Sequence, residues 1–421
     1  MMVSLADFVK NHFPVGLFSL AEKLWTDEGV KYAAETGADF LVSVQSVEPL
    51  LSLCDKYSLG IISTSNLLPF WWGGDGANAG EYAQQFPVNA MDKVKENYPQ
   101  SPRVWGDYQV DEPNVDDFEH IGNIIRKYSQ LFPEKLFFMN LYPCYGSIPK
   151  NTADEIVTQL GCSDFSGYID RYVQQIDLPY ICFDYYPYTG ANVFATYLEN
   201  LDTVAKACIK SNREMWVIMQ TGAWKAEEIL EEHQIAWQVY LSLAYGAKAI
   251  IHACYSHVWW DPSTSFVNAE GEKNPTYDYV KSINSVLHSD LGTEILKYEY
   301  TGTAVFGEIN ESNEKVRVQL EKQNERSGLT GIPDITIDST KAVVAGFFKN
   351  NDRFAVMVVN SHDPFDASVK AEVHLSMKNY KAVEVFGIEK NCAFDTASQT
   401  GTNTRIKLSS GHGALVIFKV E

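Results

Sequence analysis

The sequence predicts an α/β protein in which a parallel (β/α)8 TIM barrel is followed by a C-terminal antiparallel β-sandwich. Up to residue 295, short apolar runs alternate with amphipathic stretches, and several of these runs are apolar at consecutive positions. After residue 295 the alternation gives way to strands alone. The chain has 421 residues, 45% of them hydrophobic, which is enough for one large core and a smaller one. We therefore expect a barrel domain at residues 1–295 and a sandwich domain at 296–421.

Eight apolar runs bounded by turn residues predict the barrel strands. The run from Trp216 to Met219 is apolar throughout, as expected of a parallel strand that is covered on both faces. The predicted strands span residues 15–20, 39–44, 60–64, 104–110, 136–141, 180–185, 215–219 and 247–253.

The stretches between these runs have helical spacing. Residues 27–36, 116–131, 193–210 and 227–245 each carry apolar side chains three and four positions apart. A strand and a helix repeated eight times indicate a closed parallel barrel. An open doubly wound sheet would usually carry a glycine-rich phosphate turn, and the sequence contains no Gly-x-Gly-x-x-Gly.

The C-terminal part reads as strands joined by turns rich in Asn, Asp, Ser and Gly. Helical periodicity is absent there, and residues 310–340 are dense in charge and poor in large apolar side chains. We expect that segment to be a long, partly mobile excursion from the sandwich. The predicted strands span residues 298–305, 341–348, 353–360, 367–375, 380–386, 404–408 and 413–420.

Charge and targeting signals limit the possible partners. The formal net charge of -20 repels phosphate backbones and anionic lipid surfaces, so we expect neither a nucleic-acid nor a membrane partner. The sequence contains no run of 18 apolar residues, and its N-terminus lacks the basic and apolar regions of a signal peptide. These features predict a cytoplasmic protein.

The cysteines and histidines do not form a recognisable metal motif. Seven cysteines are scattered along the chain without a Cys-x-x-Cys pair, which is typical of reduced core thiols. His252 and His257 flank Cys254, but the sequence offers no further ligand at a suitable spacing. We expect that the protein needs neither a metal nor an organic cofactor.

Polar and aromatic side chains gather at the predicted carboxyl ends of the strands, where a (β/α)8 barrel builds its active site. Aromatic rings stack on the apolar faces of sugar rings, and carboxylates and amides bind the hydroxyl groups, so the composition favours a carbohydrate substrate. The candidates are Trp71 and Trp72 after the third strand, Asp107, Asp111 and Glu112 on the fourth, Asn140 and Tyr142 on the fifth, Asp184 and Tyr186 on the sixth, Gln220 and Trp224 on the seventh, and His252, Trp259 and Trp260 on the eighth.

Two stretches carry a resemblance to a known group of enzymes. Residues 110–113, Val-Asp-Glu-Pro, resemble the Asn-Glu-Pro motif of retaining glycoside hydrolases of the large (β/α)8 superfamily. Residues 237–251 are similar to the last helix and strand of the β-galactosidase-like members. The resemblance implies a glycosidase with Glu112 as its general acid/base. The alternative for Glu112 is a carboxylate that caps the following helix.

The resemblance also places the catalytic nucleophile at the end of the seventh strand, where this chain has Gln220. An amide is not a useful nucleophile. Three explanations are open: a Glu replaced by design to trap a substrate, an inverting mechanism with Asp184, Asp107 or Asp111 as base, or a substrate that supplies its own nucleophile and is oriented by Gln220. A barrel that only binds carbohydrate would also fit.

Asp184 is the preferred second carboxylate because it stands between an apolar strand and an aromatic loop, where an unpaired charge is costly. The alternative is a buried Asp that holds neighbouring loop amides. Asp111 replaces the Asn of the related motif, and its charge would help to keep Glu112 protonated. The sequence therefore predicts a glycosidase acting on a small or terminal sugar unit, with Glu112, Asp184 and Gln220 at its centre.

Overall fold

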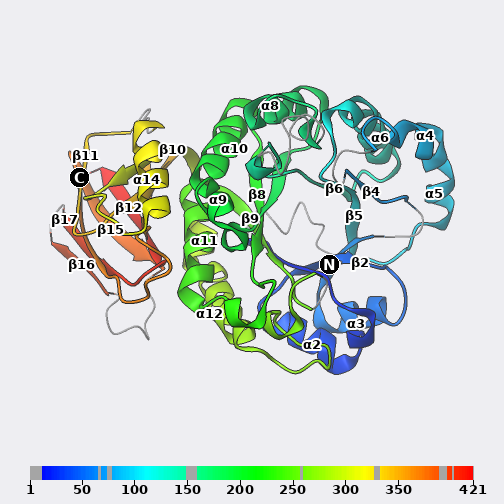
Figure 1. Cartoon of the computed structure of the whole chain (residues 1–421), viewed down its shortest axis with the longest axis horizontal. Coiled ribbons are helices and arrows are strands. Elements are labelled where there is room, and N and C mark those ends of the chain that lie inside the picture. The colour runs from blue at the N-terminus through cyan, green and yellow to red at the C-terminus, as the bar shows by residue number, and fades with distance from the viewer. Residues whose placement is uncertain are drawn as a thin grey trace.

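The computed structural model contains a barrel of eight parallel strands with a ninth, two-residue strand at its rim (Figure 1). The structure describes residues 12–64, 68–73, 78–147, 159–256, 259–326, 332–387, 396–400 and 403–420. The barrel strands are β1 (Val15–Phe18), β2 (Phe40–Val44), β3 (Gly60–Ser63), β5 (Val104–Asp111), β6 (Leu136–Asn140), β7 (Tyr180–Tyr185), β8 (Glu214–Gln220) and β9 (Ala247–Ala253).

The strands pair in parallel around the ring, and β9 returns to β1. The pairing between β6 and β7 is short. A single bridge joins Leu141 to Phe183, and the Leu141 N–H donates to the Cys182 carbonyl at 2.9 Å. The short strand β4 (Trp71–Trp72) pairs with the last two residues of β5. All eight barrel strands predicted from the sequence are confirmed. Their consecutive apolar residues are buried on both faces of the sheet, which explains why the sequence pattern identified them.

Helices surround the barrel (Figure 1). Their inward faces are apolar, as in α6, where Phe118, Ile121, Ile125 and Tyr128 are buried. The helices are α2 (Asp27–Glu35), α3 (Leu50–Tyr57), α4 (Tyr82–Gln85), α5 (Met91–Asn97), α6 (Phe118–Leu131), α8 (Phe165–Gln175), α9 (Ala191–Phe194), α10 (Tyr197–Ser211), α11 (Glu232–Ala244), α12 (Pro275–Leu287) and α13 (Asp290–Ile295). Among the described residues, no helix is both long and apolar enough to cross a bilayer.

The C-terminal part consists of two antiparallel sheets with an apolar core between them. One sheet has the order β10-β12-β13-β18-β15 and the other has the order β11-β14-β17-β16. Their strands are β10 (Glu299–Phe306), β11 (Ile335–Ser339), β12 (Val343–Asn350), β13 (Arg353–Asn360), β14 (Ala371–Met377), β15 (Tyr380–Phe386), β16 (Thr396–Thr400), β17 (Asn403–Leu408) and β18 (Gly413–Val420). The predicted α/β fold with a C-terminal sandwich is confirmed.

The expectation of a helix-free excursion at residues 310–340 is wrong. The segment contains helix α14 (Glu314–Arg326) and the strand β11. The buried face of α14 has helical spacing, but two of its four buried residues are Gln319 and Gln323, so the sequence there looks polar. Arg326 of this helix pairs with Glu199 of α10 at 2.8 Å, which ties the helix to the barrel.

The five-stranded sheet packs closely on helix α11 of the barrel. A side chain at Gly346 of β12 would meet the Ala244 carbonyl at 1.8 Å, and the Thr303 hydroxyl of β10 donates to the same carbonyl at 3.2 Å. One continuous apolar cluster includes both the barrel core and this face of the sheet. The domain boundary at residue 295 therefore stays a prediction, although α13 ends there and β10 begins at Glu299.

Candidate active site

A β-bulge in β5 determines which carboxylates of this strand reach the barrel mouth. Tyr108 faces the barrel interior, because its ring contacts Phe18 of β1 and Phe138 of β6. Strict alternation would place Asp111 on the opposite side from Tyr108. The register against β6 shifts between Tyr108 and Val110, however, so that one extra residue is inserted. Asp111 thereby joins Tyr108 on the inner side, at the carboxyl end of the strand.

The structure brings three polar residues from consecutive barrel strands together at the mouth. The Asn140 side-chain amide donates to Asp111 Oδ1 at 3.0 Å and to Asp184 Oδ1 at 2.8 Å. Asp184 and Asn140 are buried, whereas Asp111 is partly buried. A single amide nitrogen therefore links the ends of β5 and β7 through β6.

The two carboxyl groups influence each other's protonation. Burial raises the pKa of Asp184 to about 7, with a further rise from the Asp111 charge, against which hydrogen bonds from Asn140 and Tyr186 act. Burial also raises the pKa of Asp111, against hydrogen bonds from Asn140 and Tyr108. Close to neutral pH, the pair can thus hold a proton that ordinary aspartates would lose.

Glu112 follows directly after the strand, in a backbone conformation with φ of +44°. Its N–H donates to the Asn140 carbonyl at 2.9 Å, and Trp72 Nε1 donates to Glu112 Oε2 at 3.4 Å. A side chain at Gly73 would meet the Glu112 carbonyl at 1.7 Å, so a glycine is needed for this close approach. The turn after Glu112 is capped by Asn114, whose Oδ1 accepts from the Asp116 N–H at 3.0 Å. The Glu112 carboxylate is therefore not required as that cap.

Gln220 uses both ends of its amide to hold the backbone. Its Oε1 accepts from the Tyr188 N–H at 2.8 Å, and its Nε2 donates to the Gly222 carbonyl at 2.9 Å. The side chain is 1% exposed. An ionised glutamate at this position could not donate to Gly222, and its charge would be buried. Gln220 thus fastens the loops after β7 and β8 to each other.

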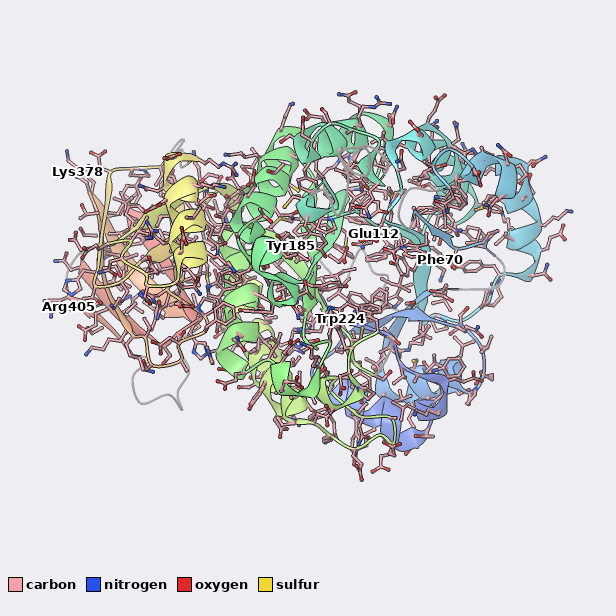
Figure 2. All side chains as sticks on the ribbon, in the orientation of Figure 1. Phe70, Glu112, Tyr185, Trp224, Lys378 and Arg405 are labelled. Carbon is pink, nitrogen blue, oxygen red and sulfur yellow. The ribbon has the colours of Figure 1, made fainter. Side chains whose placement is uncertain are left out.

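Aromatic rings line the same end of the barrel. Tyr186 contacts Trp259 and Trp260, with ring centroids 6.2 and 5.2 Å apart, and Trp224 packs against Trp260 at 4.7 Å. Trp72 and Trp224 are 57% and 54% exposed, so their faces are open to a ligand. Figure 2 shows Glu112, Phe70 and Trp224 on the inner side of the ring of barrel elements.

Four residues that the sequence assigned to substrate binding lie elsewhere in the structure. Asp107 faces the helix layer, where the hydroxyls of Tyr98 and Tyr128 donate to it at 2.6 Å each. His252 is fully buried and contacts Asn284 of α12 at 2.9 Å. Trp71 and Tyr142 are buried too, and their rings contact α4 and α8. These placements do not support a role in substrate binding for the four residues.

Sequence reasoning missed two tyrosines of the site. Burial raises the pKa of Tyr108 most, and the charges of Asp111, Asp184 and Glu112 raise it further, so all three carboxyl groups act on its hydroxyl electrostatically. Tyr145 likewise has a pKa raised first by burial and then by Asp184 and Glu112. Tyr145 lies in the loop after β6. Its position close to the carboxyl end of a predicted strand could have identified it from the sequence.

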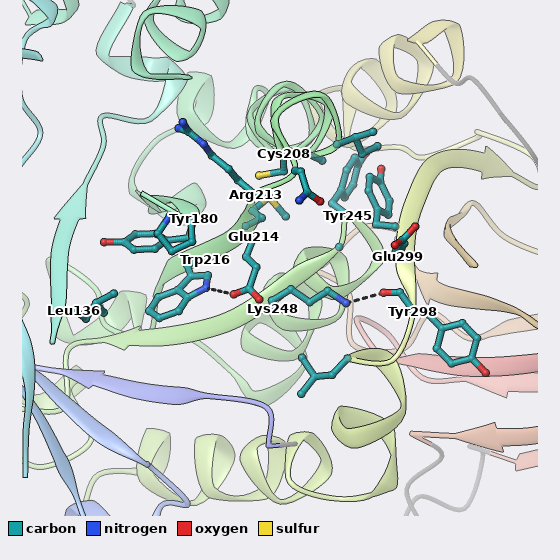
Figure 3. A pocket seen from close by; sticks show the side chains of 18 of the residues that line it. Leu136, Tyr180, Cys208, Arg213, Glu214, Trp216, Tyr245, Lys248, Tyr298 and Glu299 are labelled. Carbon is teal, nitrogen blue, oxygen red and sulfur yellow. Dashed lines mark hydrogen bonds between the residues drawn. The ribbon is translucent and has the colours of Figure 1, made fainter. Parts of the chain in front are cut away.

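A cavity lies at the other end of the barrel (Figure 3). It has a volume of about 880 Å³ and is lined by Leu136, Tyr180 and Glu214, the first residues of β6, β7 and β8. Lys248 at its wall donates to the carbonyls of Ile295 and Tyr298 at 2.9 Å each. The carboxylate cluster belongs to the strand ends, so this cavity is separate from it.

One group of potential metal ligands exists within the part of the chain that the structure describes. It consists of His12, Asp39 and His288, away from the barrel mouth. His257, which the sequence placed beside His252 and Cys254, lies outside the described residues. His252 itself faces α12.

No family model matches the chain, and no curated protein matches it in sequence. Among solved structures, the fold is similar to that of a catalytic mutant of Gan42B, a GH42 β-galactosidase from G. stearothermophilus. The TM-score is 0.57 at 8% identity, over 100% of this chain and 99% of that one. A glucosidase from Croceicoccus marinus gives a TM-score of 0.43 at 10% identity, over 98% and 96% of the two chains. The likeness to Gan42B shows a shared fold along the whole chain.

Proposed function

We propose that this protein is a glycoside hydrolase in which Glu112 is the general acid/base and Asp184 is the second carboxylate. The observation that carries the proposal is the cluster of Asp111, Asn140 and Asp184, which lies next to Glu112 at the aromatic mouth of the barrel. Acidic groups with raised pKa values, placed among tyrosines and tryptophans, suit the hydrolysis of an uncharged sugar.

Each carboxylate has a defined task in this mechanism. Protonated Glu112 gives its proton to the glycosidic oxygen as the bond to the anomeric carbon breaks. Ionised Asp184 stabilises the positive charge that develops on the sugar, and it either attacks the anomeric carbon or removes a proton from an attacking water. The Asn140 amide and the Tyr186 hydroxyl hold the Asp184 carboxylate in position by hydrogen bonds. Asp111 contributes negative charge, which favours the protonated form of its neighbours.

The contacts of Gln220 indicate that the second carboxylate comes from Asp184 and not from position 220. Both polar ends of Gln220 are occupied by backbone groups of the surrounding loops. This pattern requires one donor and one acceptor, which a neutral amide supplies and an ionised carboxylate does not. It supports Gln220 as a native structural residue and not as a disabled nucleophile.

The substrate class rests on the exposed aromatic surface. Trp72 lies beside Glu112, and Trp224 forms part of the cluster with Trp260 and Tyr186. Exposed indole rings next to carboxylates match the alternating apolar and hydroxylated faces of a sugar ring. Gan42B, whose fold this chain shares, is a β-galactosidase. A β-galactoside is therefore the first substrate to test.

The proposal is tested with a panel of 4-nitrophenyl glycosides. We expect the wild-type protein to release nitrophenol from at least one member of the panel. Asp184→Asn should lower kcat/KM by a factor of about 100 or more on this panel, and Glu112→Gln should do so on the matching phenyl glycosides, whose weakly acidic leaving group needs a positioned acid. Asp177→Asn, an exposed carboxylate before β7, is the matched control and should retain wild-type activity. Equal activity of all four proteins would refute the mechanism.

The second candidate is a barrel that binds carbohydrate without cleaving it. The Gln220 amide is hydrogen-bonded to backbone groups at both ends, and this fits a non-catalytic barrel as well as it fits the hydrolase. The same panel distinguishes the two. If the wild type cleaves none of the glycosides and isothermal titration with the corresponding sugars shows binding that Trp224→Ala abolishes, then the protein is a carbohydrate-binding barrel.

A further inference from the structure

Three side chains that are distant in sequence meet at the end of the barrel opposite to the mouth. Asp39 directly precedes β2, His12 precedes β1, and His288 directly follows α12. His12 Nε2 lies 3.0 Å from Asp39 Oδ1, and His288 Nε2 lies 3.2 Å from Asp39 Oδ2. The two Nε2 atoms are 3.1 Å apart. Two imidazole nitrogens and a carboxylate thus converge on one point.

The spacing of these atoms matches a metal centre. Zinc takes nitrogen and oxygen ligands at about 2.0–2.2 Å, so ligand atoms of a tetrahedral site lie about 3.3 Å from one another. The two ring nitrogens are 3.1 Å apart, and each lies 3.0 or 3.2 Å from a different oxygen of Asp39, which is close to that value. A small outward movement of the partly exposed His12 ring would complete the geometry and leave the fourth position to water.

We propose that His12, Asp39 and His288 form a binding site for Zn²⁺ or a chemically similar divalent transition metal. Imidazole nitrogen is a preferred ligand of zinc, copper and nickel, whereas Mg²⁺ and Ca²⁺ prefer sites built from oxygen alone. The site is independent of the proposed glycosidase mechanism, because it lies where the strands begin.

The surroundings hold the central carboxylate in place. The Val15 N–H donates to Asp39 Oδ2 at 2.8 Å, and the Gly60 N–H donates to the Asp39 carbonyl at 2.8 Å. These two hydrogen bonds fix the position of the carboxylate and of its backbone, as supporting contacts do for a metal ligand.

An ion can reach this site from solvent. The side chains of His12, His288 and Asp39 are 37%, 20% and 10% exposed. The bound ion would join the segment before β1, the start of β2 and the end of α12, which are the first and last parts of the barrel. It would therefore stabilise the folded barrel by binding only to it.

The test is isothermal titration of the full-length, untagged, metal-free protein with Zn²⁺, and separately with Mg²⁺. We expect Zn²⁺ to bind in a one-to-one ratio, to raise the Tm, and to be favoured strongly over Mg²⁺. His12→Gln and His288→Gln should each weaken Zn²⁺ binding by about 100-fold or more, since even the loss of a supporting contact costs about 10- to 100-fold. His374→Gln, which changes an exposed histidine on β14, is the matched control and should bind like the wild type.

Two further measurements keep the proposal falsifiable. Circular dichroism in the absence of metal shows whether the variants are folded. Co²⁺ in place of Zn²⁺ should give the visible absorption of a four-coordinate ion in the wild type and in His374→Gln, but not in His12→Gln or His288→Gln. Failure of the wild type to bind Zn²⁺ would overturn the proposal and leave a hydrogen-bonded clamp of two histidines on Asp39. Unchanged Zn²⁺ affinity in the folded double variant His12→Gln/His288→Gln would overturn it as well.

Discussion

Asp111 and Asp184 accept hydrogen bonds from the same nitrogen atom, the Nδ2 of Asn140, at 3.0 and 2.8 Å. The two acids come from β5 and β7, the neighbours of β6, and the barrel is closed between β6 and β7 by a single bridge. The shared donor brings their negative charges close together, which explains why each responds to the protonation of the other. This relationship has consequences for the pH dependence of both activity and stability.

The first prediction concerns the acidic limb of the pH–rate profile. Asp184 must be ionised to act as base or nucleophile, and its pKa is raised to about 7, so we expect kcat/KM to fall as the pH decreases through about 7. Asp111→Asn removes the neighbouring charge that raises this pKa. It should move the limb toward lower pH. A limb that stays in place in the Asp111→Asn variant would contradict the assignment.

The second prediction concerns stability. A folded-state pKa raised from 3.8 to about 7 means that ionised Asp184 destabilises the fold, by nothing below pH 3.8 and by the full amount above pH 7. Asp184→Asn should therefore increase the free energy of unfolding at pH 8 by up to about 4 kcal/mol, given about 1.4 kcal/mol per pKa unit. At pH 5 the gain should be smaller. Urea denaturation at the two pH values measures both, and an equal gain at both would count against the raised pKa.

The third prediction concerns Gln220→Glu. This change removes the donor to the Gly222 carbonyl and buries a carboxylate, so we expect a loss of stability of about 2–4 kcal/mol and no gain in kcat. Gln238→Glu is the matched control, because this buried amide also holds a backbone group, the Gln220 carbonyl, at 2.9 Å. It should cost stability to a similar extent. A large gain in kcat for Gln220→Glu alone would reveal a retaining enzyme that lacks its nucleophile.

The fourth prediction separates exposed from buried tryptophans. Trp224 is 54% exposed, so Trp224→Ala should raise KM by about tenfold, the loss of one stacking contact, with little change in Tm. Ile209→Ala, at a similarly exposed position on α10, should change neither quantity. Trp260→Ala should instead lower the Tm, because that ring is 1% exposed and its Nε1 donates to the Ala253 carbonyl. An unchanged KM in Trp224→Ala would exclude that ring from the substrate site.

The barrel strands could be predicted from the sequence because parallel strands covered on both faces are apolar at nearly every position. Helix α14 was missed because burial there does not coincide with apolar side chains. Its buried face includes Gln319 and Gln323, which give no hydrophobic signal, and the Gln323 amide donates to Asp202 of α10 at 3.5 Å. The helix is defined by its partners on α10 and β10, which the local sequence does not contain.

The candidate site could be predicted where a side chain lies at the carboxyl end of a strand: Glu112 directly follows β5, and Asp184 is the last residue but one of β7. It was not predictable where a local irregularity changes the face. Asp107 and Asp111 are four residues apart and would share one face in a regular strand, but the bulge after Tyr108 separates them. The partners of Gln220 were equally hidden, because Tyr188 is brought to it by the fold.

The most direct test of the central claim measures how hydrolysis depends on the leaving group. The initial rates of Glu112→Gln and Asp184→Asn are compared on a series of aryl glycosides whose phenols range from acidic to weakly acidic. If Glu112 protonates the leaving oxygen, then Glu112→Gln should keep most activity on the acidic phenols and lose it on the weak ones, whereas Asp184→Asn should lose activity on all. The reverse pattern would exchange the two roles, and the same uniform loss in both variants would contradict the assignment of Glu112 as the acid.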